Sequence, residues 1–353
     1  MVNEIFLKLL GVLEKIRDFI VNWGLKTLVA IIVLIIIHNV IKIGEISSRY
    51  TGEYKNLTPV YEKENKFMNY YTVGEGEKTI VILPEFGSQS PIIQYKALVN
   101  GLKDKYKVVV IEYFGYGFSM SMKNHERTND NIVDEVKKVL EYREIYGPYV
   151  FIAADTSNIY AMRFQEKYPE LVQGIISIDG VYPAEVNDEF LLSNIRNRVS
   201  NININSIFEL TGFERIVSYV SPKVFYIDKM KKMTDVYTKE DISIYRNRIG
   251  SSYLSRTMVR EANKLEENMY NMKDYKWKEN IPVLEIVSSE KKDIYENYKN
   301  SNKSNINLID LANEVITNNT IQRIEAIDGN QQMLQLSNTG WLLQAVRNFL
   351  SDF

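Results

Sequence analysis

The sequence contains no cysteine and only two histidines, His38 and His125, among 353 residues. The absence of cysteine excludes disulfides, thiol nucleophiles and thiolate metal sites, although it does not indicate a compartment. Two histidines are too few for an imidazole-rich metal site, so we expect no metal site and no cofactor. Any mechanism that needs a histidine base has only these two candidates.

The sequence also lacks a surplus of either charge. Lys and Arg number 43 against 45 Asp and Glu, which gives a formal net charge of -2. Without a basic surplus, we expect no nucleic-acid partner. Hydrophobic residues make up 45% and charged residues 25%, and these values are typical of globular proteins. The length suffices for one large domain or two small ones with a sizeable core.

One long apolar run lies near the N-terminus, between Leu28 and Ile37, and extends through His38 to Ile43. A membrane span needs ~20 mostly apolar residues, and residues 26–43 nearly reach that length if Lys26 and Lys42 extend toward the interfaces. We therefore predict a single transmembrane helix over 26–43. A cleaved signal peptide is an alternative, but no small-x-small cleavage site follows Ile43. A second alternative is that this helix packs onto the globular domain and does not enter a membrane.

Residues 1–25 place apolar side chains at helical spacing and predict an amphipathic helix at the membrane interface or on a partner. These side chains are Ile5, Leu9, Val12, Ile16, Ile20 and Trp23. A linker over 44–56 follows the span, and membrane lipid is the expected partner of the N-terminal region. We expect a single-pass protein with its globular domain outside the cytoplasm, because Lys26 and the interfacial helix precede the span. The flanking charges are nearly balanced and favour this orientation only weakly.

Beyond residue 57, short β-branched runs alternate with helical periods. The predicted strands are Met68–Val73, Thr79–Leu83, Lys107–Ile111, Tyr149–Ile152, Gly174–Ile178, Val283–Val287 and Ile321–Ile327, and the predicted helices are Ile92–Lys103, Asn131–Tyr146, Asn158–Lys167 and Trp341–Leu350. This alternation favours a mostly parallel sheet covered on both faces. The first two strands, joined by residues 74–77, are interpreted as an antiparallel hairpin.

Residues 181–278 interrupt the alternation with several helical stretches and no strand. An insertion of this kind at the carboxyl edge of a parallel sheet is typical of a cap over a ligand pocket. We therefore divide the domain into a core over 57–180 and 279–353 and a helical cap over 181–278. The polar stretch Asn300–Asn319 is interpreted as a mobile loop.

Several stretches, in this order, resemble the α/β-hydrolase superfamily, in particular a membrane-anchored bacterial group within it. They are Thr79–Gly87 (TIVILPEFG), Ser90–Leu98, Lys107–Glu112, Gly115–Ser119 (GYGFS), Gly147–Ile152, Tyr160–Pro169 and Val172–Asp179. The likeness covers about 60–185 and returns at Ile281–Val287 and Ile324–Leu350. It implies an α/β-hydrolase fold: a mostly parallel central sheet, helices on both faces and a helical cap.

The chemistry of that family needs a nucleophile on a sharp strand-to-helix turn, an acid after a late strand and a histidine base before the last helix. The turn here is residues 153–157, with Asp155 at the nucleophile position. The acid position falls on Lys291 or Lys292, of which we choose Lys292, and the base position falls on Gln332, or on Gln331 if the register slips. Neither histidine can replace the base, because His38 lies in the membrane run and His125 lies in the loop before the helix predicted over Asn131–Tyr146.

The resemblance also assigns the oxyanion donors to Phe86 and Thr156, and places Glu85 and Ser157 at the pocket. Glu85 stands where the family usually carries a glycine. Because the triad positions are substituted while the scaffold motifs persist, we predict a catalytically inactive pseudoenzyme that binds a small-molecule ligand or a protein partner.

Two other interpretations of Asp155 remain open. An Asp nucleophile is known in dehalogenase-like and epoxide-hydrolase-like branches, so Asp155 could attack an ester-like or halogenated substrate, although those branches need a histidine for the second step. Alternatively, its carboxylate caps the following helix by accepting from the amides of Ser157 or Asn158. In that case a polar chain of Lys, Gln and Asp could cross the former triad.

Overall fold

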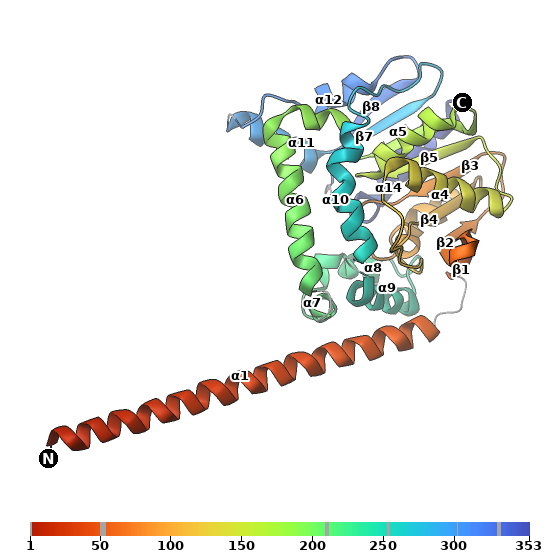
Figure 1. Cartoon of the computed structure of the whole chain (residues 1–353). Coiled ribbons are helices and arrows are strands. Elements are labelled where there is room, and N and C mark those ends of the chain that lie inside the picture. The colour runs from red at the N-terminus through yellow and green to blue at the C-terminus, as the bar shows by residue number, and fades with distance from the viewer. Residues whose placement is uncertain (1, 50–53, 209–211, 253–254, 302, 330–332) are drawn as a thin grey trace.

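The computed structural model describes the chain except at residues 1, 50–53, 209–211, 253–254, 302 and 330–332 (Figure 1). Its centre is an eight-stranded sheet in the order β1-β2-β4-β3-β5-β6-β7-β8. The strands are β1 (Asn56–Tyr61), β2 (Lys66–Val73), β3 (Thr79–Leu83), β4 (Lys107–Glu112), β5 (Tyr149–Ala154), β6 (Val172–Ile178), β7 (Val283–Ser288) and β8 (Gln322–Ile327). The strands β3, β4, β5, β6, β7 and β8 run parallel to one another, whereas β1 and β2 are antiparallel to their neighbours. This order and the helices around it form an α/β-hydrolase fold.

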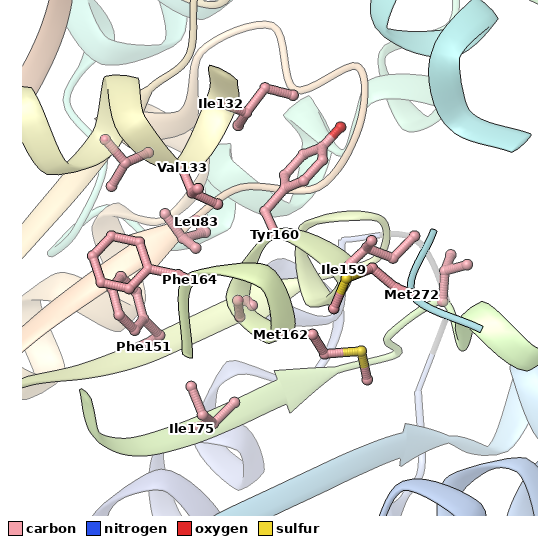
Figure 2. Close-up of a cluster of buried hydrophobic side chains, with 14 of the residues drawn as sticks. Leu83, Ile132, Val133, Phe151, Ile159, Tyr160, Met162, Phe164, Ile175 and Met272 are labelled. Atoms are coloured by element: carbon pink, nitrogen blue, oxygen red, sulfur yellow. The ribbon is translucent and has the colours of Figure 1, made fainter. Parts of the chain in front are cut away.

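Helices cover both faces of the sheet, because successive side chains of a strand point to opposite faces. The core helices are α2 (Pro91–Gln94), α3 (Lys96–Leu102), α4 (Asn129–Tyr142), α5 (Ser157–Lys167), α11 (Ser289–Asn300), α12 (Leu308–Val315), α13 (Leu334–Ser337) and α14 (Thr339–Ser351). On one face, Phe151 packs against Phe164 of α5, with their ring centroids 4.7 Å apart, and Val133 of α4 belongs to the same cluster (Figure 2). On the other face, Val150 and Ile152 pack against α3 and α14. The central strands β3 to β7 are therefore buried on both sides, which explains their largely apolar runs.

The predicted hairpin between the first two strands is wrong. β2 pairs with β1 and β4, and β3 pairs with β4 and β5, so β4 lies between the two strands that were expected to pair. The glycines of the connection serve close packing instead: a Cβ at Gly74, where φ is +81°, would lie 2.3 Å from the Lys103 carbonyl oxygen. β1 was not predicted, and its side chains alternate only between half-buried and buried positions after the exposed Asn56.

The cap lies between β6 and β7. It consists of α6 (Glu189–Phe208), α7 (Phe213–Val220), α8 (Ile227–Lys232), α9 (Lys239–Ser252) and α10 (Arg256–Tyr270), with short 3-10 turns at Pro183–Asn187 and Pro222–Phe225. The core has two such turns, at Glu62–Glu64 and Pro169–Leu171. Over the described residues between the two strands the chain forms helices and no strand, as the sequence predicted. Asn300–Asn319 was expected to be a loop throughout, but α12 lies within it because Leu308, Leu311, Ala312 and Val315 are buried at helical spacing.

The N-terminal region forms one helix, α1 (Val2–Arg49), with no break at the predicted boundary between residues 25 and 26. Its apolar stretch, Gly11–His38, is long and apolar enough to cross a membrane, and none of it is buried against the domain. A signal sequence would satisfy the same test of length and composition. The apolar stretch includes Val12 to Trp23, which the sequence analysis assigned to a separate interfacial helix. In one continuous helix these residues lengthen the apolar stretch.

Candidate functional site

The turn after β5 has the strained geometry of a nucleophile elbow. Asp155 follows the last residue of the strand with a φ of 50°, a left-handed conformation that costs a non-glycine residue about 1 kcal/mol or more. The Asp155 amide donates to the Ile178 carbonyl (3.0 Å), and the Val181 amide donates to the Asp155 carbonyl (3.1 Å). The end of β6 and the start of the cap therefore hold the elbow in place.

The carboxylate of Asp155 pairs with Arg198 of the cap helix α6. Arg198 Nη2 lies 2.8 Å from Asp155 Oδ2, and Nη1 lies 3.3 Å from Oδ1, so both ends of the guanidinium reach the carboxylate. The guanidinium also lies 5.7 Å from the ring centroid of Phe86. Arg198 thus stands between the nucleophile position and one residue assigned to the oxyanion loop.

Asp155 does not cap α5 through the amides of Ser157 or Asn158, as the sequence suggested; the backbone amide that its carboxylate meets is that of Thr156. The Asn158 amide donates to the backbone carbonyl of Asp155 (3.2 Å), and no side chain caps α5 within the described residues. The capping prediction considered only groups close in sequence. The guanidinium of Arg198, 43 residues away, is a stronger partner than a backbone amide because its hydrogen bonds are charge-assisted at both ends.

The ion pair favours the charged form of Asp155. Burial alone would raise the pKa of this carboxyl, but the Arg198 guanidinium, together with Lys291 and the Thr156 amide, holds the pKa below its usual value. About 20% of the Asp155 side chain and 41% of the Arg198 side chain remain exposed, so solvent still reaches the pair. At neutral pH the site presents a carboxylate whose charge is already matched by the cap.

Three further carboxyl groups surround this pair, and burial raises the pKa of each. The pKa of Asp179 rises to about 6. The pKa of Glu85 is also raised by burial, and its carboxylate accepts from Tyr95 Oη and, at 3.3 Å, from Gln335 Nε2. The pKa of Glu185 is raised in the same way, and its Oε1 accepts from the Tyr182 amide (3.0 Å). The carboxylate of Glu85, which the sequence assigned to the pocket, is thus held by the side chains of Tyr95 and Gln335.

At the acid position the two lysines behave differently. Lys292, the residue chosen from the sequence, is exposed and lies 3.7 Å from Glu296 on the surface of α11. Lys291 is buried, and its Nζ donates to the carbonyl oxygens of Asp179 (3.1 Å) and Gly180 (2.5 Å). Consecutive side chains on a helix point about 100° apart, so Lys291 turns toward the end of β6 and Lys292 toward solvent. Of the two residues considered for the acid position, Lys291 is therefore the one whose charge acts on Asp155.

Thr156 and Ser157 lie buried at the start of α5. Ser157 Oγ donates to the Pro84 carbonyl (2.5 Å) and lies 2.9 Å from Tyr113 Oη, so it joins the elbow to the β3 loop. Phe86 is half-buried beside Arg198. The expected polar chain through Gln332 cannot be followed, since Gln331 and Gln332 lie outside the described residues. Lys291 meets backbone carbonyls at the end of β6 rather than Asp155.

Neither histidine belongs to the site. His38 is exposed on α1, and His125 Nε2 lies 2.8 Å from Glu64 Oε1 while its ring stacks on Tyr61 at 4.2 Å. Among the residues that the structure describes, no imidazole is therefore available to activate water at Asp155. This agrees with the placement of both residues from the sequence.

Arg198 is the site residue that the sequence analysis missed. It lies in a helical stretch rich in asparagine and arginine, where Arg196 two positions earlier pairs with Glu266 on the surface. The only signal was an arginine on a helix expected to cover the pocket, and it does not distinguish Arg198 from Arg196.

Comparison with solved structures agrees with the fold. The matches include the epoxide hydrolase CorEH (15% identity, TM-score 0.59, covering 84% of this chain and 98% of that chain). Another is a laboratory-evolved variant of the potato epoxide hydrolase StEH1 (15% identity, TM-score 0.60, 84% and 99%). A third is Cfl2 from Burkholderia cenocepacia (15% identity, TM-score 0.60, 83% and 94%). At this identity the likeness establishes the α/β-hydrolase fold and no activity.

No protein-family profile matches the chain. Among curated proteins, it is similar to "Uncharacterized protein YbdG" of Bacillus subtilis (strain 168), with 26% identity over 192 residues. The aligned region covers 54% of this chain and 56% of that protein, so the chain spans little more than half the length of this relative.

Proposed function

We propose that this chain is a membrane-anchored α/β-hydrolase-like pseudoenzyme, which binds a ligand or partner at the contact of cap and core and does not turn it over. The observation that carries the proposal is the two-point ion pair between Arg198 and Asp155. A nucleophilic carboxylate must approach an electrophilic carbon with a free oxygen. Here both oxygens face a guanidinium, and an incoming group has to displace it.

The substituted triad positions support the same proposal. When an Asp carboxylate displaces halide from a haloalkane or opens an epoxide, it becomes an ester, and when it expels the alcohol from an ester substrate, it becomes an anhydride. A base must then activate the water that cleaves an ester of this kind. Lys291 is a buried cation at the acid position, and glutamine at position 332 has no useful proton affinity near neutral pH. An ester formed on Asp155 would therefore persist, and the protein would stop after one turnover.

The alternative function is hydrolysis of an ester-like or halogenated substrate through Asp155. Two observations favour it: the elbow keeps its left-handed φ of 50°, and the lowered pKa keeps the carboxylate ionised. Both would serve a nucleophile. In this alternative, Arg198 swings away when the substrate enters.

A combined turnover and mass experiment distinguishes the two functions. The full chain in detergent is incubated with a nitrophenyl ester, an epoxide and a bromoalkane, with Asp155→Ala as the matched control. We expect product release equal to that of the control and no mass added at Asp155. Repeated turnover that Asp155→Ala abolishes would overturn the pseudoenzyme proposal. A single adduct at Asp155 without turnover would show a reactive nucleophile that lacks its base.

We further propose that α1 crosses the membrane once and holds the domain outside the cytoplasm. The exposed apolar stretch Gly11–His38 supports a membrane partner. The orientation is the one expected from the sequence, and because Lys26 falls inside this stretch, the structure adds no support for it. Protease added to intact cells should remove the domain, whereas full protection of the domain would reverse the orientation. Finding the mature N-terminus near residue 44 would show instead that the helix is a cleaved signal.

A further inference from the structure

An apolar face lies exposed at one end of the cap. We call it the cap-tip face and define it by Ile216, Tyr219 and Val220 of α7 and Val224 of the turn that follows. Their exposed fractions are 52%, 61%, 80% and 59%. Ile216 lies three positions before Tyr219 and four before Val220, so both neighbour it on one side of the helix. Large apolar side chains gathered on a surface are typical of a site that binds a protein partner, a membrane or a ligand.

The position of this face relates it to the N-terminal helix. α9 contacts both α7 and α1, and Figure 1 shows α7, α8 and α9 at the end of the domain that faces α1. Five peptide steps join Arg49 to Tyr54, which limits their separation to about 18 Å even when fully extended. If Gly11–His38 crosses a bilayer, the cap tip is therefore held close to the bilayer surface.

The charge around the face agrees with a lipid surface. Residues 213–232 contain five basic and two acidic side chains, and Lys223, Lys231 and Lys232 are exposed. Lysines beside an apolar helix face are typical of segments that lie at an anionic bilayer surface. Tyr219 fits the same place, since tyrosine combines an apolar ring with a polar end and is enriched at membrane interfaces.

We propose that the cap-tip face inserts into the headgroup region of the bilayer that α1 crosses, so that the domain has a second contact with lipid. This inference rests on the proposed role of α1 as a membrane anchor.

The absence of cysteine allows a direct test, because each introduced cysteine is the only one in the chain. Val220→Cys, Val29→Cys and Tyr146→Cys are prepared in the full chain, labelled with an environment-sensitive fluorophore and reconstituted into vesicles containing phosphatidylcholine and phosphatidylglycerol. Val29 lies in the apolar stretch of α1 and tests the anchor. Tyr146 is 71% exposed and lies just before β5, at the end of the sheet opposite the cap, and is the control.

Quenching is then compared between the three sites with two sets of lipids, one with a nitroxide near the headgroup and one with a nitroxide in the acyl chain. We expect strong quenching at Val29 by the acyl-chain nitroxide, because this site lies within the span, and at Val220 by the headgroup nitroxide, roughly twofold or more above Tyr146 and less so in phosphatidylcholine alone. Quenching at Val29 with Val220 no different from Tyr146 would overturn the docking inference and leave the anchor intact. No quenching at either Val29 or Val220 would overturn both.

A charge substitution provides a second measurement. On the labelled Val220→Cys chain, Ile216→Glu should lower the quenching toward the Tyr146 level, because a carboxylate on the face opposes insertion. Tyr270→Glu is the matched control: Tyr270 is 57% exposed and ends α10, near Asn268, which bonds to Asn129 of the core. Equal quenching in the two variants, or loss of lipid quenching together with cross-linking of two chains through position 220, would overturn the inference.

Discussion

Removal of the Arg198 guanidinium should destabilise the protein in a way that depends on pH. In Arg198→Ala, Asp155 loses the partner that offsets its burial, and a carboxylate left without a partner is costly. Fully buried pairs cost about 3–5 kcal/mol when one partner is removed, whereas exposed pairs contribute about 0.2–1 kcal/mol. Because 41% of Arg198 and 20% of Asp155 are exposed, we expect the free energy of unfolding to fall by about 1–2 kcal/mol at pH 7.

The sign of the pH dependence follows from the lowered pKa of Asp155. A carboxyl whose pKa is lower in the folded state adds stability above its unfolded pKa of about 3.9 and loses it as the pH falls through the folded pKa. The difference between the wild type and Arg198→Ala should therefore be largest near pH 7 and should shrink below about pH 4. Urea unfolding of the full chain in detergent, followed by tryptophan fluorescence at several pH values, measures it.

Arg196→Ala is the matched control, since Arg196 lies on the same helix and its pair with Glu266 is exposed. We expect this substitution to change stability little. A double-mutant cycle of Arg198→Ala with Asp155→Asn should give a coupling of about 1 kcal/mol. Equal effects of the two arginine substitutions, or a loss in Arg198→Ala that does not depend on pH, would refute this assignment of the ion pair.

Three further predictions concern the site and its support. Asp155→Ser should give no ester hydrolysis above the Asp155→Ala background in a nitrophenyl ester assay, because triad members act strongly non-additively and the base is still missing; clear turnover would contradict this reasoning. Glu261→Ala leaves the buried hydroxyls of Tyr116 and Tyr160 without the carboxylate that accepts from them. The free energy of unfolding in urea should therefore fall by about 1–3 kcal/mol, and an unchanged midpoint would contradict this expectation. Gly180→Ala would place a Cβ 2.4 Å from Ser177 Oγ and 2.5 Å from Asn158 Nδ2, so thermal unfolding should show a loss of about 1–3 kcal/mol, and a midpoint equal to the wild type would mean that the turn adapts freely.

The sequence determined the frame of the sheet. The predicted strand Thr79–Leu83 agrees with β3 at both ends, because a strand buried on both faces is apolar at nearly every position. It also determined the position of the elbow, since the order of the strands and helices around Asp155 fixes where the chain turns. That neither histidine lies beside Asp155 could likewise be inferred from the sequence, because only His38 and His125 exist and both lie in stretches far from the elbow.

Only the tertiary structure decided which groups meet. β4 separates β2 from β3, although their short glycine connection suggested a hairpin, because hydrogen-bonding partners in a sheet are chosen by the packing of the whole layer. The phase of α11 turns Lys291 inward and Lys292 outward, a difference that counting along the chain could not resolve. Arg198 reaches Asp155 from a helix 43 residues away, and sequence patterns carry no record of such distant pairs. The local patterns therefore set the scaffold, whereas the charge of the site depends on how the cap folds back over the sheet.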